Sequence, residues 1–228
     1  MMSSQEEFLK FIENISEQWQ TKEVDPAIVQ QLASCDDSLI RNVIAKKLVF
    51  FDSDIAEPIL LRLLKDSDRL VRVNACDSLC ISHSEKIRDI LLDIGENGDY
   101  LMRGYAILSA TDITIGNGFD HTPVVEFLNR RIKKEKSTWV RINCYTALYQ
   151  LGETKYLQFL FVELDNRYYR NRCLVVNSLS NIVDDRNKKP IQKKLKERLQ
   201  KEKARSVKMS IQDLSLIHIC VPAVPETF

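Results

Sequence analysis

The chain has 228 residues, 44% of them hydrophobic, and a formal net charge of +1. A chain of this size and composition can bury a substantial core without disulfides or a structural metal. No segment carries about 18 unbroken apolar residues, which excludes a membrane-spanning helix, and the N-terminal stretch is too polar for a secretory signal.

The first predicted element is an amphipathic helix in the N-terminal segment, residues 1–24. Its apolar side chains share one side of the helix over residues 5–20: Phe8, Leu9, Ile12, Ile15 and Trp19. In a stack of repeated units, a terminal element has to cover the exposed apolar side of its neighbour. We therefore predict that residues 1–24 form a capping helix for the repeat domain that follows over residues 25–213.

Five arginines mark an internal repeat in that domain. They are separated by 31, 31, 38 and 31 residues, and they are Arg41, Arg72, Arg103, Arg141 and Arg172. The residues one before, three after and seven after each arginine are apolar or small, with a single exception. Because 3.6 residues make one helical turn, these positions share one face. Each arginine is therefore predicted to lie in the first turn of an amphipathic helix, capped in most units by Asp or Ser.

A second apolar stretch lies between successive arginines, as in Ile55, Ile59, Leu60 and Leu63. The repeat unit is therefore a helix, a short turn and a second helix. Two helices alone cannot bury both apolar sides, whereas stacked neighbours can. The predicted fold is an all-α, right-handed α-solenoid of about five to six antiparallel helix pairs in a single domain.

The repeat resembles the HEAT-like family of α-solenoids. The matching segments are residues 68–75, DRLVRVNA, and residues 137–144, STWVRINC. Both follow the Asp/Ser-x-x-Val-Arg-x-x-Ala pattern with which that family begins the second helix of a unit. Gly104, directly after the third arginine, and Asn171, directly before the fifth, depart from the pattern. The resemblance implies antiparallel helix pairs whose second helices line the inner curve of the solenoid.

Two segments fall outside the regular repeat. The extra seven residues between Arg103 and Arg141 map to Thr111–Phe119, where two glycines flank an asparagine, and we predict a turn-rich loop at the edge of the stack. Residues 214–228 begin with Leu-Ser-Leu-Ile-His-Ile, the translation of a transposase adapter used in sequencing libraries. We predict that residues 214–228 are a non-native tail and that the natural sequence continues beyond Asp213.

The six cysteines do not form a disulfide framework. Cys76 and Cys80 are four residues apart on one predicted helix, and Cys144 and Cys173 lie within repeat helices. Free buried cysteine behaves as a small hydrophobic residue, which is typical of the reducing cytoplasm. The three histidines lack the spacing of metal-binding helices, so we predict a cytoplasmic protein without a metal site.

The repeated arginines are predicted to be structural. In the first turn of a second helix, each arginine can reach aspartates of its own turn and of the neighbouring turn. A bidentate arginine–carboxylate pair would fix one unit against the next. We therefore expect a ladder of such pairs along the stack, and no direct part in binding a partner.

Candidate binding residues follow from the same register. Positions two, five and six after each arginine point away from the buried face of the second helices and are predicted to line a polar concave groove: Asn74, Asp77, Ser78, Tyr105, Ser109, Asn143, Thr146 and Asn177. The sequence shows no clustered carboxylates, nucleophile–base pair or glycine-rich phosphate loop. We expect a non-catalytic scaffold or adaptor that binds a protein or peptide partner along this face, with no cofactor and no small-molecule substrate.

The charge distribution supports an alternative function. Residues 1–100 carry 11 Lys/Arg against 19 Asp/Glu, and residues 101–228 carry 22 against 13. The basic residues that would form a nucleic-acid patch are Arg130, Arg131, Lys133, Lys134, Lys193 and Lys194. Within the HEAT-like resemblance, DNA glycosylases for alkylated bases use a basic concave groove, with Trp139, Tyr145 and Asp112 as the candidate site residues here. The simpler interpretation of such charged runs is a solvated helix face.

Overall fold

The computed structural model describes the backbone of residues 25–217 and the side chains of residues 25–214. The predicted capping helix, residues 1–24, lies outside the described residues, and so do residues 218–228. The described part contains twelve α-helices, two short 3-10 helices and no strand. The predicted all-α class is confirmed.

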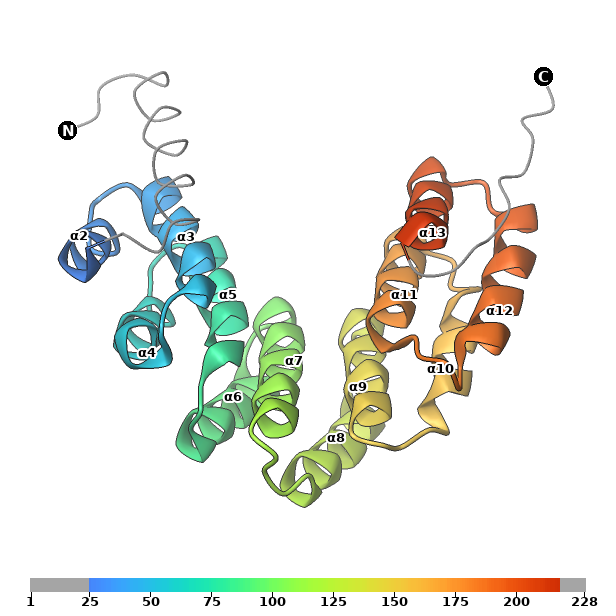
Figure 1. Ribbon diagram of the computed structural model, residues 1–228, viewed down its shortest axis with the longest axis horizontal. Coiled ribbons are helices and arrows are strands. Elements are labelled where there is room, and N and C mark those ends of the chain that lie inside the picture. The colour runs from blue at the N-terminus through green and yellow to red at the C-terminus, as the bar shows by residue number, and fades with distance from the viewer. Residues whose placement is uncertain (1–24, 218–228) are drawn as a thin grey trace.

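The helices form six antiparallel pairs that are arranged in two rows (Figure 1). The first helices of the pairs, which form the outer row, are α2 (Pro26–Leu32), α4 (Ser53–Leu63), α6 (Glu85–Asn97), α8 (Thr122–Lys134), α10 (Tyr156–Glu163) and α12 (Lys188–Lys201). The second helices, which form the inner row, are α3 (Ser38–Lys47), α5 (Arg69–Ser78), α7 (Tyr100–Gly116), α9 (Thr138–Gln150), α11 (Tyr169–Ile182) and α13 (Arg205–Ile217). The 3-10 helices η1 (Leu48–Phe50) and η2 (Leu79–Ile81) extend α3 and α5.

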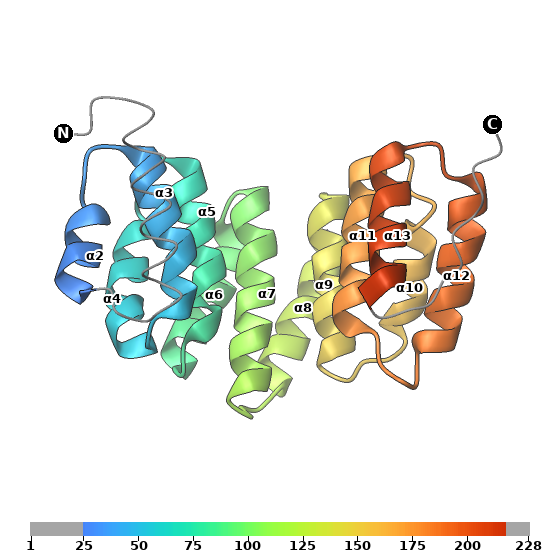
Figure 2. The ribbon, with the colours of Figure 1, turned by 45° about the horizontal axis from the view of Figure 1, so that its top comes forward.

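The stack is curved, with the inner row on its concave side (Figures 1 and 2). Each second helix contacts the next one, from α3 to α13 without interruption. The first helices are splayed apart along the outer row. Because one row is packed closely and the other is spread, the pairs follow an arc, and the surface of the inner row is the concave side of an α-solenoid.

The second helices begin where the sequence predicts. Asp37, Asp68 and Asp99 each accept a hydrogen bond from a backbone N–H of the first turn, and Ser137 does so in α9. These bonds satisfy donors that a helix N-terminus otherwise leaves unpaired. The exception is α11, which follows Tyr168 and has no side-chain cap.

The core consists of the apolar positions that the repeat predicts. The residues three and seven after the five arginines have no solvent-exposed surface: Ile44, Ala75, Ala106, Cys144, Val175, Leu48, Leu79, Ala110, Leu148 and Leu179. Burying one leucine or isoleucine side chain contributes about 1.5–3 kcal/mol. Since these positions recur once in every unit, the apolar stabilisation is spread evenly along the stack.

The predicted loop at Thr111–Phe119 is wrong for most of its length, because α7 continues to Gly116 and has 17 residues. The hydroxyl groups of Thr111 and Thr114 donate to carbonyl oxygens one turn earlier, at 2.8 Å and 2.7 Å, so both polar side chains are satisfied although they are buried. The helix ends at Gly116, and Gly118 two residues later has a φ of 65°, the left-handed conformation that glycine adopts readily. The insertion therefore lengthens a helix of the inner row.

The last helix of the inner row, α13, crosses the predicted end of the native sequence at Asp213. Val207, Ile211 and Leu214 are buried in the core at helical spacing. The apolar face of α13 therefore includes the first residue of the predicted tail. The assignment of residues 214–228 as a non-native tail stays a prediction.

All five repeat arginines stabilise the turn that precedes their own helix. Each Nη1 group donates to a backbone carbonyl oxygen five or six residues earlier, at 2.7–3.2 Å. The acceptors belong to Cys35, Asp66, Gly98, Glu135 and Asn166. Carbonyl oxygens in a turn have no helical partner, so the arginine satisfies a group that the change of chain direction leaves free.

Three of the five arginines also bind the next repeat unit. Each uses Nε and Nη2 in a bidentate ion pair with a carboxylate in the turn before the next second helix, at 2.7–3.0 Å. The pairs are Arg41–Asp66, Arg103–Glu135 and Arg172–Glu202. A planar guanidinium and a carboxylate meet edge to edge, so each pair restricts both the distance and the rotation between two units.

The ladder is interrupted at Arg72 and Arg141, contrary to the prediction of a continuous series. Among the described residues, neither of these arginines forms an ion pair. The carboxylate acceptor lies six residues before the next arginine, and that position holds Asn97 and Asn166 at the two interrupted junctions. An amide is uncharged and cannot replace the carboxylate of a bidentate ion pair.

A second arginine holds two of the three carboxylates. Arg131 and Arg198 lie four residues before Glu135 and Glu202, and their Nε groups donate to the same carboxylates at 2.9 Å and 2.8 Å. The two glutamate side chains are 1% and 0% exposed. Burial opposes ionisation, but backbone N–H groups and two guanidiniums outweigh it and lower the pKa of each glutamate to about 2. Arg131, predicted from the sequence to belong to a nucleic-acid patch, is therefore buried in a structural ion pair with Glu135.

We predict that Arg103→Ala destabilises the protein more than Arg72→Ala. Both variants lose hydrogen bonds to their own turn, but only Arg103→Ala removes one partner of a buried carboxylate, at a cost of about 3 kcal/mol. The loss for Arg72→Ala should be about 1 kcal/mol, the scale of ordinary hydrogen bonds. Urea unfolding measures both values. Equal losses would contradict a role for Arg103 in joining two units.

We also predict that Glu135 makes the stability depend on acid pH. Its pKa is about 2 in the folded chain, against a usual value of 4.5. A depressed pKa stabilises the folded state above about pH 4.5, and this contribution, of the order of 3 kcal/mol, is lost as the pH falls toward 2. Glu135→Gln should lower the free energy of unfolding at pH 7 and flatten its decline between pH 4.5 and 2.

The matched control is Glu126→Gln, which changes an exposed residue of the same helix, α8. Unfolding curves for the three proteins are compared from pH 7 to pH 2. If Glu135→Gln loses stability on acidification as steeply as the unmodified protein, the glutamate is not the group responsible.

Candidate partner-binding surface

The predicted groove residues do not all reach the concave surface. Asp77 and Asn177 are exposed, and Asn74 and Tyr105 are half-buried. The remaining four are buried, which corrects the prediction: Ser78, Ser109, Asn143 and Thr146. Half of the eight residues predicted to line the groove are therefore inaccessible to a partner.

Packing between second helices explains the error. Position six after the arginine faces the neighbouring helix of the inner row, as shown by the Ser109 hydroxyl, which donates to the carbonyl oxygen of Asp77 on α5 at 3.1 Å. On α9, Thr146 turns its hydroxyl back to the carbonyl oxygen of Ile142 at 2.9 Å. Small polar residues at these positions allow close contact between helices.

An aromatic cluster of Tyr100, Tyr105 and Trp139 lies between α7 and α9. The Trp139 ring is 6.2 Å from that of Tyr100, in an edge-to-face arrangement, and 5.6 Å from that of Tyr105. The cluster depends on Gly104, because a Cβ atom at this position would lie 1.9 Å from Cζ3 of Trp139. The glycine that departs from the family pattern therefore makes room for the tryptophan.

The cluster is one part of a longer row of apolar residues. Every second helix from α3 to α11 carries a large apolar residue in its first turn that is exposed or half-buried. We call these five residues the first-turn row: Leu39, Leu70, Tyr100, Trp139 and Tyr169. The sequence predictions omitted this row. The sequence feature that could have identified the row is a large apolar residue two or three positions before each repeat arginine, at a position outside the buried face.

Two carboxylates of neighbouring inner-row helices lie close to each other, and one of them, Asp77, is also close to Tyr105. Asp77 on α5 and Asp112 on α7 are close enough for the charge of one to affect the other. Partial desolvation in the concavity, together with the charge of Asp77, raises the pKa of Asp112 to about 6. Desolvation also raises the pKa of Asp77, and Lys46 on α3 opposes that change. The two carboxylates therefore influence each other's ionisation at the middle of the inner row.

The predicted basic residues lie elsewhere, on α8 and α12 of the outer row (Figure 1). Lys134 is paired with Glu96, and Lys194 is paired with Glu197 at 3.2 Å. Arg130, Lys133 and Lys193 are exposed. Because the two helices are separated along the outer row, these residues do not form one basic surface on the concave side.

The three residues considered for a glycosylase site do not form one group either. Tyr145 is buried and stacks on Tyr156 of α10, with 5.8 Å between ring centroids. Trp139 packs on α7 through Gly104. The tyrosine and the tryptophan therefore contact different helices, and no aromatic pocket for a base is formed from them.

The described cysteines are free. Burial raises the pKa of Cys80 to about 11 and that of Cys144 to about 12. A buried thiol that stays protonated is a poor nucleophile and a poor metal ligand. Within residues 25–214, no group of three or more histidine, cysteine, aspartate or glutamate side chains is placed to bind a metal. No helix in the described part is both long and apolar enough to span a membrane.

No protein-family model matches the chain, and neither does any curated protein sequence. Among solved structures, the X-ray structure of Escherichia coli YibA is similar with a TM-score of 0.55 and 19% identity, over 96% of this chain and 80% of YibA. The complex of CpcE and CpcF of phycocyanin lyase from Nostoc sp. PCC7120 has a TM-score of 0.48 and 15% identity, over 84% of this chain and 93% of that one. The similarity to YibA establishes a HEAT-like α-solenoid fold.

We predict that Gly104→Ala destabilises the protein by about 1–3 kcal/mol, because the new methyl group would force Trp139 out of its position. The control is the same change in a Trp139→Ala background, where the conflict is absent. There the substitution should be neutral or stabilising by up to about 1 kcal/mol, because alanine favours a helix more than glycine does. Thermal unfolding measures both effects, and equal effects in both backgrounds would contradict the contact.

Proposed function

We propose that this protein is a non-catalytic scaffold or adaptor that binds a protein or peptide partner along its concave side. The observation that carries the proposal is the first-turn row, which places apolar side chains in water at the ends of successive helices. Leu39, Leu70, Tyr100 and Tyr169 are 59%, 56%, 46% and 45% exposed. Regularly placed apolar anchors on a rigid scaffold are typical of a surface that binds other proteins.

The spacing of the row suits an extended polypeptide. Neighbouring packed helices lie about 8–10 Å apart, and an extended chain advances about 3.3 Å per residue. Every third residue of a bound segment could therefore contact one member of the row. Aromatic members such as Tyr100 and Tyr169 provide a large contact area with little loss of side-chain freedom.

The charges of the inner row favour a partner with a basic residue. Asp77 lies near Tyr105, and Asp112 lies near Asp77, at the middle of the stack. A lysine or arginine of the partner would reduce the repulsion between the two carboxylates and could contact the aromatic rings. We therefore propose a partner segment with spaced apolar residues and a central basic residue. The free cysteines support a reducing compartment, the cytoplasm.

Nucleic-acid binding is the alternative, and the arrangement of the basic residues supports it less well. A phosphate backbone is bound through many cations on one surface. In this chain the candidate cations lie on α8 and α12, and Arg131 is buried in an ion pair. Binding through phosphates would weaken steeply with salt, whereas binding through the first-turn row would not.

We predict that a photoreactive phenylalanine analogue at position 70 or 100 forms cross-links to a partner protein in extract of the native organism. The controls are positions 50 and 162, where Phe50 and Val162 are apolar and 65% and 71% exposed but lie outside the row. The same protein should be captured at positions 70 and 100, and much less at 50 and 162, in both low and high salt. Equal capture at all four positions, or salt-sensitive cross-links to nucleic acid, would contradict the proposal.

A further inference from the structure

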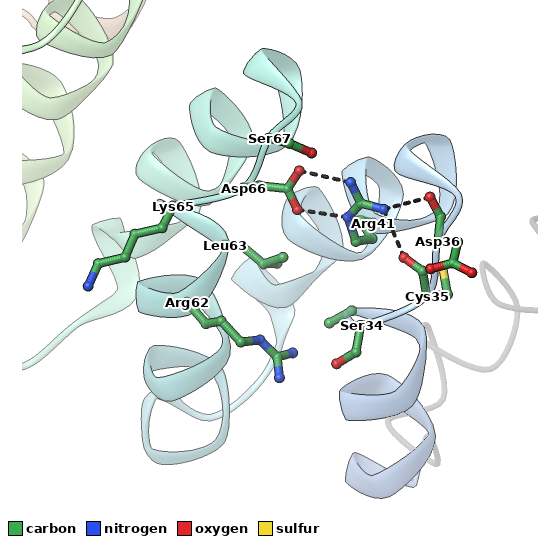
Figure 3. A pocket seen from close by; sticks show the side chains of 10 residues that line it. Ser34, Cys35, Asp36, Arg41, Arg62, Leu63, Lys65, Asp66 and Ser67 are labelled. Atoms are coloured by element: carbon green, nitrogen blue, oxygen red, sulfur yellow. Dashed lines mark hydrogen bonds and ion pairs between the residues drawn. The ribbon is translucent and has the colours of Figure 1, made fainter.

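A second surface feature, unrelated to the first-turn row, is a pocket at the N-terminal end of the stack (Figure 3). It has a volume of about 660 Å³ and lies between the loop that joins α2 to α3 and the turn that joins α4 to α5. Its lining includes Ser34, Cys35, Arg41, Arg62, Asp66 and Ser67. We propose that this pocket binds a carboxylate group through the guanidinium of Arg62.

The argument begins with a motif that occurs three times in the chain. An arginine precedes an acidic residue by four positions at Arg62–Asp66, Arg131–Glu135 and Arg198–Glu202. The acidic residue is always six positions before a repeat arginine or, in the last unit, before the lysine that replaces it. The three sites are therefore equivalent positions of the solenoid, and their contacts can be compared directly.

In the second and third sites, one carboxylate is held between two arginines. Glu135 accepts from Arg103 of the preceding unit and from its own Arg131. Glu202 is held in the same way by Arg172 and Arg198. This position of the fold therefore places two guanidiniums around one carboxylate.

The first site differs because its acidic residue is aspartate, which is one methylene shorter. Both oxygens of Asp66 are bound by Arg41, at 2.7 Å and 2.9 Å, and one also accepts from the backbone N–H of Asp68. Among the described residues, Arg62 has no hydrogen-bond or ion-pair partner, and it is exposed. Its guanidinium extends into the pocket toward Ser34, away from Asp66 (Figure 3).

The chemistry of the pocket selects a carboxylate. A guanidinium offers paired N–H donors that match two carboxylate oxygens. The charged residues of the lining, Arg41, Arg62, Lys65, Asp36 and Asp66, sum to +1, and Asp66 is already neutralised by Arg41. The chain itself holds a carboxylate beside the equivalent arginine in both other sites. Arg131 and Arg198 each bind a glutamate of the chain itself. A carboxylate from a ligand would give Arg62 the equivalent contact at the first site.

The test uses the full chain with 15N-labelled arginine and follows the Nε–H signal of Arg62 by NMR. Two probes are titrated at constant ionic strength, free L-glutamate and a hexaglutamate peptide with blocked ends, with a hexaglutamine peptide as the control. We expect a saturable shift of the Arg62 signal with glutamate or hexaglutamate and none with hexaglutamine. A response to glutamate indicates a small-molecule carboxylate as the source, and a response to the peptide alone indicates an acidic segment of a protein.

Three variants make the test specific. Arg62→Gln should weaken binding at least tenfold, measured through the signals of Arg41 and the neighbouring backbone. Asp66→Glu should also weaken it at least tenfold and raise the melting temperature, because the longer side chain can reach Arg62. Arg130→Gln, at an exposed arginine of α8, should change binding less than twofold. Lack of a saturable shift with either acidic probe, or undiminished binding by Arg62→Gln, would overturn the proposal.

The site and the proposed scaffold function are independent. Arg62 lies on α4 of the outer row, and none of the lining residues belongs to the first-turn row. Arg62→Gln should therefore leave cross-linking at position 100 unchanged. A negative NMR result would overturn only the proposed carboxylate site, and a negative cross-linking result would overturn only the proposed partner binding on the concave side.

Discussion

At three of its five junctions, the stack is joined by a buried carboxylate of one helix pair that an arginine of the preceding pair binds. The side chains of Glu135 and Glu202 have almost no access to water, so their charges are tolerated only because guanidiniums and backbone N–H groups surround them. The same arginines bind the carbonyl oxygens of their own turns. Arg103 and Arg172 therefore each stabilise the turn of their own unit and orient the next unit against it. Apolar contacts alone do not specify this orientation.

The proposed binding surface follows from that placement. With successive second helices held in contact, their first turns lie side by side on the concave side, and the apolar residues at those turns form a row. Close contact also requires small side chains where the helices meet, and Gly104 and Ser109 meet this requirement. Small buried residues such as Gly104 and Ser109 let the helices pack closely, and the large apolar residues of the first-turn row are left exposed or half-buried at the surface.

Much of the fold could be predicted from the sequence, because the apolar face and the capping residues are local patterns with a helical period. Ile44, Ala75 and Val175 were placed correctly from their distance to the arginines. The errors concern contacts between units. The burial of Ser109 depends on a neighbouring helix, and the end of the extended α7 is bound to another unit through Asn117, which donates to the carbonyl oxygen of Ser82 at 3.0 Å. A single unit carries no information about either contact. Of the eight residues predicted to line the concave side, four are therefore buried.

From Arg72 onward, the position six residues before each second-helix arginine, or the lysine in the last unit, alternates between a carboxylate and an asparagine along the chain. The units are therefore joined by an ion pair only at every other junction. The central claim, that arginine–carboxylate pairs join the units, can be tested most directly by a double-mutant cycle on Arg172 and Glu202. Urea unfolding of Arg172→Ala, Glu202→Gln and the double variant gives the coupling free energy. We predict a coupling of at least about 2 kcal/mol. A coupling near zero would contradict the claim and leave apolar packing as the force that orients the units.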